Sequence, residues 1–444
     1  MKVLVLYYNC VLEGKYELRN TIREHLYSFR HYCPDTDFHY YNALSGIPAY
    51  LAAVKYDGII LHYTLLAVRW QPEFFEMYCR WLRRLARLPG YVVAIPQDEY
   101  AESTTLCRFF RMFGVKAVFT CLSPRDYQAV YPREETGLTH YFTVFPGYVD
   151  ERAKRYLDAR RAAAENREID IGYRARKVPY WLGRHGQMKH ELGERVAVAC
   201  RDTELRTDIS NQIEDVFLEH EWYDFLCRCR TVLGCEGGAS LLDRSDTVRP
   251  LVTAYCDSHP DASFDEVERQ FFPGQDYNIH LFALSPRHFE CAVTKTCQVL
   301  IEGNYGGVFK PGQHYIEVKK DYSNLPDVIA KIGDHELCRH LAETAYRDIA
   351  ESAKYTYRAF AEKVLDHIRT QSAAAGSGTP VNNVVFQTVG YWLAVRERFE
   401  PAVARLFVLN LRYGIRALCT FILEPGKKER IRRMIARWTR AGGR

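Results

Sequence analysis

The 444-residue sequence contains no run of 18 or more uncharged apolar residues, so no membrane-spanning helix is expected. The opening "MKVLVLYYNC" carries neither a basic leader nor a cleavage site, and it is typical of a first core strand rather than of an export signal. No G-x-x-x-x-G-K-[ST] or G-x-G-x-x-G loop occurs, so ATPase and dehydrogenase functions lose support. No D-x-D motif stands in a convincing metal-binding context. These absences favour a globular protein that neither spans a membrane nor belongs to the ATPase, dehydrogenase or D-x-D metal-binding classes.

The fourteen cysteines are spread through the chain and form no C-x-x-C pair. Reduced, mostly buried thiols in a cytoplasmic protein explain them best. Cys227 and Cys229 stand in a "CRC" sequence that has some likeness to a metal site. No His or Cys pair with ligand spacing accompanies them, so a zinc site is disfavoured.

Charge is distributed unevenly along the chain, whose net charge is +5. Residues 391–444 contain 13 Lys or Arg and 4 Asp or Glu, a net charge of +9, which leaves −4 for the first 390 residues. The mildly acidic body argues against a general nucleic-acid binder. The basic tail is expected to seek an anionic surface.

Strand-like and helix-like stretches alternate through most of the sequence, which predicts an α/β protein with parallel sheets covered by helices on both faces. We expect two doubly wound, Rossmann-like domains with a cleft between the carboxyl ends of their sheets. Residues 243–277 are predicted to be irregular. The polar "QSAAAGSGTP" is typical of a linker. The expected parts are a first domain (1–150), a connecting helix (151–168), a second domain (169–370), a linker (371–380) and a basic amphipathic helical tail (381–444).

Residues 285–307, "SPRHFECAVTKTCQVLIEGNYGG", predict a helix, a strand and a glycine-rich turn. Ser285 is a favourable N-cap and Pro286 a favourable first helical residue. Glu290 lies off the buried stripe of this helix, near its start. The pattern alone allows a solvated surface charge or a hydrogen-bond acceptor for a sugar hydroxyl.

The same stretch, extended through "VFKPGQHYIEVKKDYSNLPDVIAKI", resembles the donor-binding half of GT-B glycosyltransferases, particularly the spore-coat-protein-like domains related to family 4. The resemblance implies a nucleotide-sugar donor in the second domain and an acceptor in the first. It further implies that Glu290 binds the nucleotide ribose, with Arg287 beside it, and that no metal ion or other cofactor is needed. Phe282 stands where family 4 has a first glutamate, which leaves the donor sugar and the stereochemistry open.

Two other segments of the second domain are candidates for the donor site. Arg174 and Arg176 follow a predicted strand, together with Lys177 and Arg184, and such cations suit a diphosphate leaving group; an ordinary basic surface loop is the alternative. The segment "GCEGGASLLD" offers a close backbone approach to a ligand or a plain tight turn. Its candidate residues are Glu236, Gly237, Gly238 and Ser240.

The candidate catalytic residues of the first domain are Asp98, Glu99 and His62, each at the end of an apolar strand. An inverting transferase needs a general base for the acceptor hydroxyl, and Asp, Glu and His are the usual choices. A retaining enzyme does not need that base, and a lone His at a strand end is often structural.

The sequence therefore predicts a cytoplasmic glycosyltransferase that moves a sugar from a nucleotide donor to a glycan or lipid-linked acceptor. Its tail would contact the inner face of a membrane or, alternatively, pack on the protein. Three other functions stay open: a non-catalytic sugar-nucleotide or glycan-binding relative, a GT-B-like epimerase, and a nucleic-acid or scaffold protein that uses the basic tail.

Overall fold

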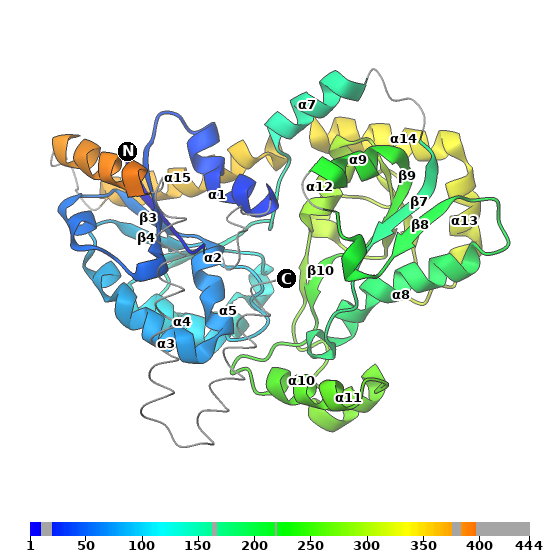
Figure 1. The fold of residues 1–444 in the computed structure, drawn as a ribbon, viewed down its shortest axis with the longest axis horizontal. Helices are drawn as coiled ribbons and strands as arrows, with labels where there is room; N and C mark the ends of the chain where they lie inside the picture. Colours follow the sequence, from blue (N-terminus) through cyan, green and yellow to red (C-terminus); the bar gives the residue numbers. More distant parts are fainter. Residues whose placement is uncertain (10–19, 162–166, 218–219, 375–382, 397–444) are drawn as a thin grey trace. The chain divides into compact units, whose positions relative to one another are not determined.

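The computed structural model describes residues 1–9, 20–161, 167–217, 220–374 and 383–396. The chain divides into two compact units. Unit 1 comprises Met1–Leu18, Thr36–Val92 and Arg369–Arg444, and unit 2 comprises Arg19–Asp35 and Val93–Ile368. Figure 1 shows the elements of both units, coloured along the sequence.

Unit 1 contains a parallel sheet whose strands run in the order β2 (Asp37–Asn42), β1 (Lys2–Tyr7) and β3 (Gly58–Leu61). Every residue of β1 and β3 is buried, as continuous apolar runs in a parallel sheet require. The helices that follow β3 are α2 (Tyr63–Leu66) and α3 (Pro72–Trp81), and Pro72 occupies the first turn of α3.

The start of the predicted tail is helical over residues 383–396 and packs on β2 within unit 1. The Phe386 ring stacks on His39 with a centroid distance of 3.8 Å. Arg396 donates to the Tyr41 hydroxyl over 2.6 Å. This part of the tail is therefore held by its own unit, and the rest of the tail, 397–444, lies outside the described residues. No helix in the described part of the chain is long and apolar enough to cross a membrane.

Unit 2 begins with α1 (Asn20–Tyr32) and contains parallel strands in the order β4 (Tyr91–Ala94), β5 (Ala117–Thr120) and β6 (His140–Thr143). The first residues of β4 belong to unit 1. Helices α4 (Ser103–Met112), α5 (Tyr127–Val130) and α6 (Arg133–Thr136) connect these strands, and α7 (Glu151–Arg161) follows them.

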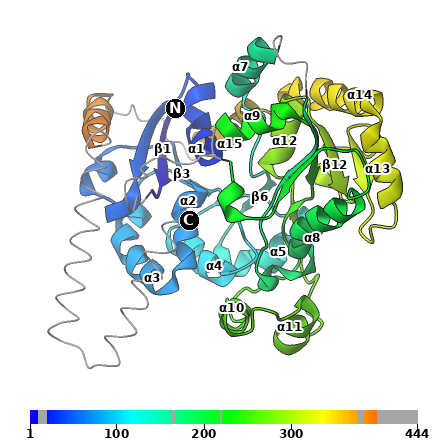
Figure 2. The same ribbon diagram turned by 45° about the vertical axis from the view of Figure 1, so that its right-hand side comes forward.

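A second parallel sheet in unit 2 has the order β13 (Tyr315–Val318), β12 (Cys297–Ile301), β9 (Cys229–Gly234), β7 (Ile169–Arg174) and β8 (Thr207–Ser210). One apolar cluster joins this sheet to α8 (Gly183–Ala199), α13 (Leu325–Gly333) and α14 (His335–Ala345). Other clusters join it to α9 (His220–Arg228) and α12 (Pro286–Val293). Helices thus cover both faces of the sheet (Figure 2). Helix α15 (Tyr357–Ala374) begins in unit 2, and its residues from Arg369 on belong to unit 1.

Between β9 and α12 the chain forms a short antiparallel strand pair, β10 (Gly237–Ala239) with β11 (Leu281–Ala283). This pair is called the hairpin below, although two helices separate its strands in the sequence. The residues between these strands form α10 (Val248–Ser258) and α11 (Phe264–Phe271), which share a small apolar core around Val252 and Val267. The expectation that residues 243–277 are irregular is therefore wrong. Two short amphipathic helices bury their apolar faces against each other here.

The predicted α/β class with two Rossmann-like parallel sheets is confirmed, and so is helix beyond the predicted linker. The predicted domain boundaries stay predictions. The helix expected in residues 151–168 corresponds to α7.

Candidate functional site

Unit 2 contains a cavity of about 980 Å³ at the carboxyl ends of its strands. Ligands of α/β proteins bind at such strand ends because the loops that follow the strands converge there. At the carboxyl ends of β5 and β6, the residues that line it include Cys121, Ser123, Arg125, Thr143 and Phe145. The segments after β9, β12 and β13 contribute Glu236, Glu302, Asn304 and Lys320, and the region of β11 contributes His280 and Phe282.

Glu236 directly follows β9 and is 5% exposed. Its Oε1 accepts a hydrogen bond of 2.7 Å from the backbone N–H of Tyr305, and the N–H of Asn304 also donates to this carboxylate. Asn304 is right-handed (φ −88°) and Tyr305 left-handed (φ 48°), which is the backbone nest that binds anions. Burial raises the pKa of Glu236, while the two N–H groups and the charge of Lys320 oppose the rise. The Glu236 carboxylate is thus the internal anion that orders the loop after β12.

The glycines after Glu236 have a structural explanation. Gly238 has a φ of +102°, and a Cβ there would lie 1.9 Å from the carbonyl oxygen of Leu281. Only glycine allows this close pairing of β10 with β11. A Cβ on Gly237 would lie 3.6 Å from the Ala283 oxygen, an ordinary contact.

Ser240 joins the hairpin to the start of α8. Its hydroxyl donates to Asp276 over 2.6 Å and accepts from the N–H of His185 over 3.1 Å. Asp276 also accepts from the N–H of Arg184 over 3.1 Å. The first N–H groups of α8 are therefore satisfied by the protein itself.

Phe282 presents an aromatic surface to the cavity. Its ring stacks on His185 with a centroid distance of 3.9 Å, and His280 lies 5.4 Å from it. Burial lowers the pKa of His185 to about 4, so this imidazole is neutral near pH 7. The Phe282 ring that lines the cavity is thus backed by a neutral imidazole, that of His185.

Helix α12 begins directly after Leu284 and Ser285, and Leu284 lines the cavity. Ser285 caps the helix by accepting from the N–H of Arg287 over 3.3 Å, as its sequence predicted. Glu290 Oε2 accepts a hydrogen bond of 2.7 Å from the indole N–H of Trp222 on α9. Burial raises the pKa of Glu290, and the Trp222 bond and the Arg287 charge oppose that rise.

The Arg287 guanidinium lies over two aromatic rings, 4.9 Å from the Trp222 centroid and 5.9 Å from that of Tyr173. Arg287 is half-buried. The Arg287 cation and the Glu290 carboxylate thus stand one turn apart on α12. The carboxylate accepts a hydrogen bond from the Trp222 indole, and the cation lies over the ring of the same indole.

Arg174 is held inside unit 2. Its guanidinium forms a 2.7 Å ion pair with Asp208 and donates to the carbonyl oxygen of Asp215 over 3.0 Å. It also lies 4.5 Å from the Phe225 ring centroid. These contacts favour a structural role, and the expectation that Arg174 binds diphosphate stays a prediction.

The other cations of the same loop differ in their surroundings. Arg184 pairs with Asp265 and with Glu268. Arg176 is exposed to solvent, as is Lys177, whose ammonium lies 5.2 Å from the Tyr180 ring centroid. Arg176 is therefore the more accessible of the two arginines predicted to bind the diphosphate.

Glu99 and Asp98 follow β4 but have different surroundings. Glu99 is fully buried and accepts hydrogen bonds from the Thr120 hydroxyl and, over 3.2 Å, from the N–H of Cys121. Asp98 is exposed and has a left-handed backbone (φ 55°), a conformation that is often kept at functional sites. The buried carboxylate anchors the end of β5, which leaves Asp98 as the accessible acid.

His62 belongs to unit 1, where it caps α2. Its Nδ1 accepts from the N–H of Thr64 over 3.3 Å and lies 3.0 Å from the Thr64 hydroxyl. The imidazole is fully buried. Capping of α2 is a structural role for His62, which was the alternative to catalysis in the sequence. The catalytic role of His62 stays a prediction.

Sequence reasoning did not select four residues that the structure places at these sites, which are His280, Glu302, Lys320 and Trp222. Glu302 and Lys320 each follow a strand of the second sheet, so position at a strand end was the available signal. Trp222 had no comparable signal, because its partner lies 68 residues further along the chain. In the described part of the chain, no group of three or more His, Cys, Asp or Glu side chains is arranged to hold a metal ion.

No protein-family model matches the sequence, and no curated protein matches it significantly. Solved structures with some likeness include HepE of Anabaena in complex with UDP and glucose (9% identity, 83% of this chain and 100% of that chain, TM-score 0.43). Another is the DNA-modifying enzyme beta-glucosyltransferase (10% identity, 83% and 100%, TM-score 0.46). A third is AviGT4, a glycosyltransferase involved in avilamycin A biosynthesis (11% identity, 84% and 98%, TM-score 0.45). Likeness at this level assigns no activity to this chain.

Proposed function

We propose that this protein is a GT-B glycosyltransferase that transfers a sugar from a nucleotide-activated donor to an acceptor hydroxyl. The observation that carries the proposal is that Arg287 and Glu290 stand one turn apart on α12, a helix that begins directly after the cavity-lining segment Phe282–Leu284. The Glu290 carboxylate is an acceptor for ribose hydroxyls, and the Arg287 guanidinium is a donor for phosphate oxygens. The sequence resemblance to GT-B donor domains supports the same assignment.

The proposed chemistry needs positive charge at the diphosphate. Negative charge accumulates there as the glycosidic bond breaks, and fixed donors aimed at that charge lower the barrier. Arg287 and the exposed Arg176 are the proposed donors, with arginine acting in place of a divalent ion. We therefore propose a metal-independent reaction that needs no cofactor beyond the donor substrate.

The sugar and the acceptor are assigned to the cavity. Its volume of about 980 Å³ lies at the upper end of the range typical of small-molecule sites, which suits a sugar together with part of an acceptor. In an inverting reaction, Asp98 would be the base that takes the proton of the acceptor hydroxyl, because it is the accessible acid after β4. Glu99 and His62 would act by positioning. The donor sugar and the stereochemical course are not assigned.

The acceptor class that we propose is a lipid-linked or cell-surface glycan in polysaccharide biosynthesis, with the protein at the cytoplasmic face of a membrane. The support is the net charge of +9 in residues 391–444 together with two exposed aromatic residues, Tyr391 (68%) and Trp392 (60%). Tyr and Trp favour membrane interfaces, and basic residues favour anionic lipid. Co-sedimentation with phosphatidylglycerol vesicles, compared with phosphatidylcholine vesicles, tests this assignment.

The donor assignment is tested by calorimetric titration with UDP, GDP, ADP and CMP. We expect one of them to bind, and we expect Glu290→Ala to weaken that binding at least tenfold. Glu336→Gln, on an exposed side chain of α14, is the matched control and should bind like the wild type. Absence of binding to all four nucleotides would refute the proposal.

Turnover of the matching nucleotide sugars separates the proposed enzyme from its alternatives. Release of the nucleoside diphosphate supports transfer or hydrolysis. Tight binding without turnover indicates a non-catalytic binding protein. An isomerised sugar that is still attached to its nucleotide, detected by nuclear magnetic resonance, indicates an epimerase.

A further inference from the structure

We infer that Trp222 is a positioning residue for the nucleotide: its indole N–H fixes the Glu290 carboxylate in the orientation that accepts hydrogen bonds from the ribose hydroxyls. The inference rests on the proposed function and adds a residue on a different helix to the donor site. Trp222 contributes from α9, and Glu290 lies on α12.

The hydrogen bond between the two side chains has a defined direction. The indole Nε1 lies 2.7 Å from Glu290 Oε2, and an indole N–H can only donate. A carboxylate offers about four acceptor positions, so one bond from Trp222 fixes the group and leaves positions for ligand hydroxyls. Trp222 is itself half-buried and packs on Phe225, with a centroid distance of 5.7 Å, which limits the rotation of its ring.

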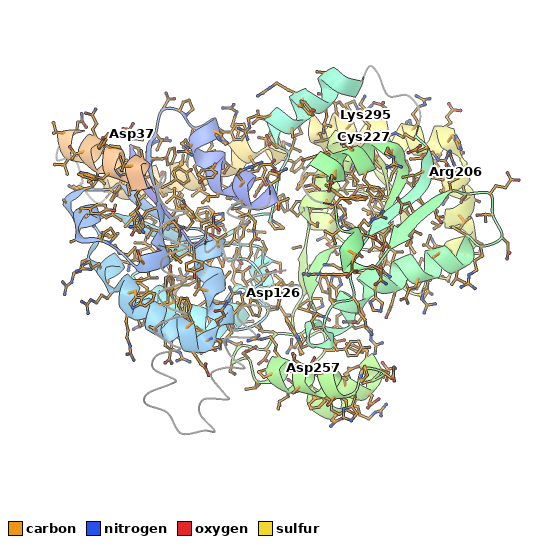
Figure 3. All side chains as sticks on the ribbon, viewed as in Figure 1. Asp37, Asp126, Arg206, Cys227, Asp257 and Lys295 are labelled. Carbon is orange, nitrogen blue, oxygen red and sulfur yellow. The ribbon has the colours of Figure 1, made fainter. Side chains whose placement is uncertain are left out.

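The two helices are also joined near their carboxyl ends. The Thr296 hydroxyl, just beyond α12, donates to the carbonyl oxygen of Leu226 on α9 over 2.8 Å. Arg167 donates to the same Leu226 oxygen over 3.2 Å and to the Thr294 oxygen over 2.7 Å. Figure 3 labels Cys227 on α9 and Lys295 just past α12, in this region. The distance between Trp222 and Glu290 is therefore fixed by a framework that does not depend on their own bond.

The charge of Glu290 depends on its surroundings. Burial disfavours the carboxylate, and the Trp222 N–H and the Arg287 cation favour it. The other titratable groups near it are Glu24 on α1, Tyr223 on α9 and Cys291 on α12. None of these is cationic, so Arg287 and Trp222 are the two groups identified as stabilising the charge.

The same indole contacts the cation of the site, since the Arg287 guanidinium lies 4.9 Å from its ring centroid. A phenylalanine at 222 keeps an aromatic face for Arg287 and removes the N–H. Trp222→Phe therefore tests the hydrogen bond separately from the ring, and Trp222→His restores a ring N–H on a smaller side chain.

The test is calorimetric titration of the full-length protein with the best-binding nucleotide of the panel and with its 2′-deoxy form, from pH 5 to pH 8. We expect Trp222→Phe to weaken binding of the ribonucleotide about 10- to 30-fold, as for loss of a hydrogen bond to a charged group. The affinity for the 2′-deoxy form should fall much less, because this nucleotide lacks a hydroxyl that donates a hydrogen bond to Glu290. The pH at which binding is half lost on acidification should rise, since the Glu290 carboxylate loses a stabilising donor.

Trp222→His should recover part of the affinity. Trp181→Phe is the matched control and should leave binding unchanged. The Trp181 ring packs on Tyr100, with a centroid distance of 5.9 Å. Circular dichroism at each pH verifies that the variants are folded.

Three results would count against the inference. Wild-type affinity in Trp222→Phe overturns it and leaves the proposed function intact. Equal losses for the two nucleotide forms, with an unchanged pH profile, show a merely structural role and also overturn it. Failure of the wild type to bind any nucleotide refutes the proposed function, and the inference with it.

Discussion

The Glu236 carboxylate accepts a 2.7 Å hydrogen bond from the backbone N–H of Tyr305, which joins the end of β9 to the loop after β12. Glu236→Ala leaves the N–H groups of Asn304 and Tyr305 without this buried acceptor. We expect the free energy of unfolding to fall by about 2–3 kcal/mol, since a hydrogen bond to a charged acceptor contributes roughly 1.5–3 kcal/mol. Urea unfolding measures the change. Glu302→Ala, on an exposed residue that lines the same cavity, should change stability by less than about 0.5 kcal/mol.

The neighbouring glycines provide a matched pair of substitutions. Gly238→Ala places a Cβ 1.9 Å from the Leu281 oxygen at a φ of +102°, whereas Gly237→Ala meets only an ordinary contact at 3.6 Å. We expect Gly238→Ala to lower the free energy of unfolding by more than about 2 kcal/mol and Gly237→Ala by less than about 1 kcal/mol. Equal effects in urea unfolding would disprove the assignment of Gly238 to hairpin pairing.

Arg174 and Arg176 are expected to respond to substitution in opposite ways. Arg174→Lys loses the planar contacts to Asp208 and Asp215 and should lower stability by about 1–2 kcal/mol, with little effect on nucleotide affinity. Arg176→Gln should leave stability unchanged and weaken binding of the nucleoside diphosphate. Unfolding and titration curves measured on the same preparations decide between the roles. A stable Arg174→Lys protein with reduced affinity would restore Arg174 as a diphosphate ligand.

Glu24 gives the protein a pH-dependent stability. Burial, followed by the nearby charges of Asp150 and Glu290, raises the pKa of this carboxyl from 4.5 to about 8. Because the folded state then keeps a proton that the unfolded state releases, this contribution to stability is complete below pH 4.5 and is lost as the pH rises toward 8.

Glu24→Gln should remove that dependence. We expect the variant to exceed the wild type in stability by on the order of 2 kcal/mol at pH 8.5, with a smaller difference at pH 5. Urea unfolding at the two pH values measures this, with Glu336→Gln as the control. If the wild type and Glu24→Gln show the same pH slope, the raised pKa of Glu24 is disproved.

Local patterns were sufficient to predict individual elements. The alternation of apolar strands and amphipathic helices predicted the parallel sheets, because burial on both faces requires continuous apolar strands. Ser285 and Pro286 predicted the start of α12, because an N-cap acts within one helical turn. The same reasoning missed α10 and α11, whose short apolar stripes become informative only once they face each other.

The sequence by itself determined the fold class, the start of α12 and the presence of a carboxylate and a cation on that helix. Tertiary structure decided which polar groups pair. Arg174 and Arg176 look alike in the sequence, yet Asp208 lies beside Arg174 only because β8 pairs with β7. Trp222 reaches Glu290 only because α9 and α12 are brought together, and Glu236 meets Tyr305 because β9 lies next to β12. Such contacts join residues far apart in the chain, and no periodicity or spacing along the sequence encodes them.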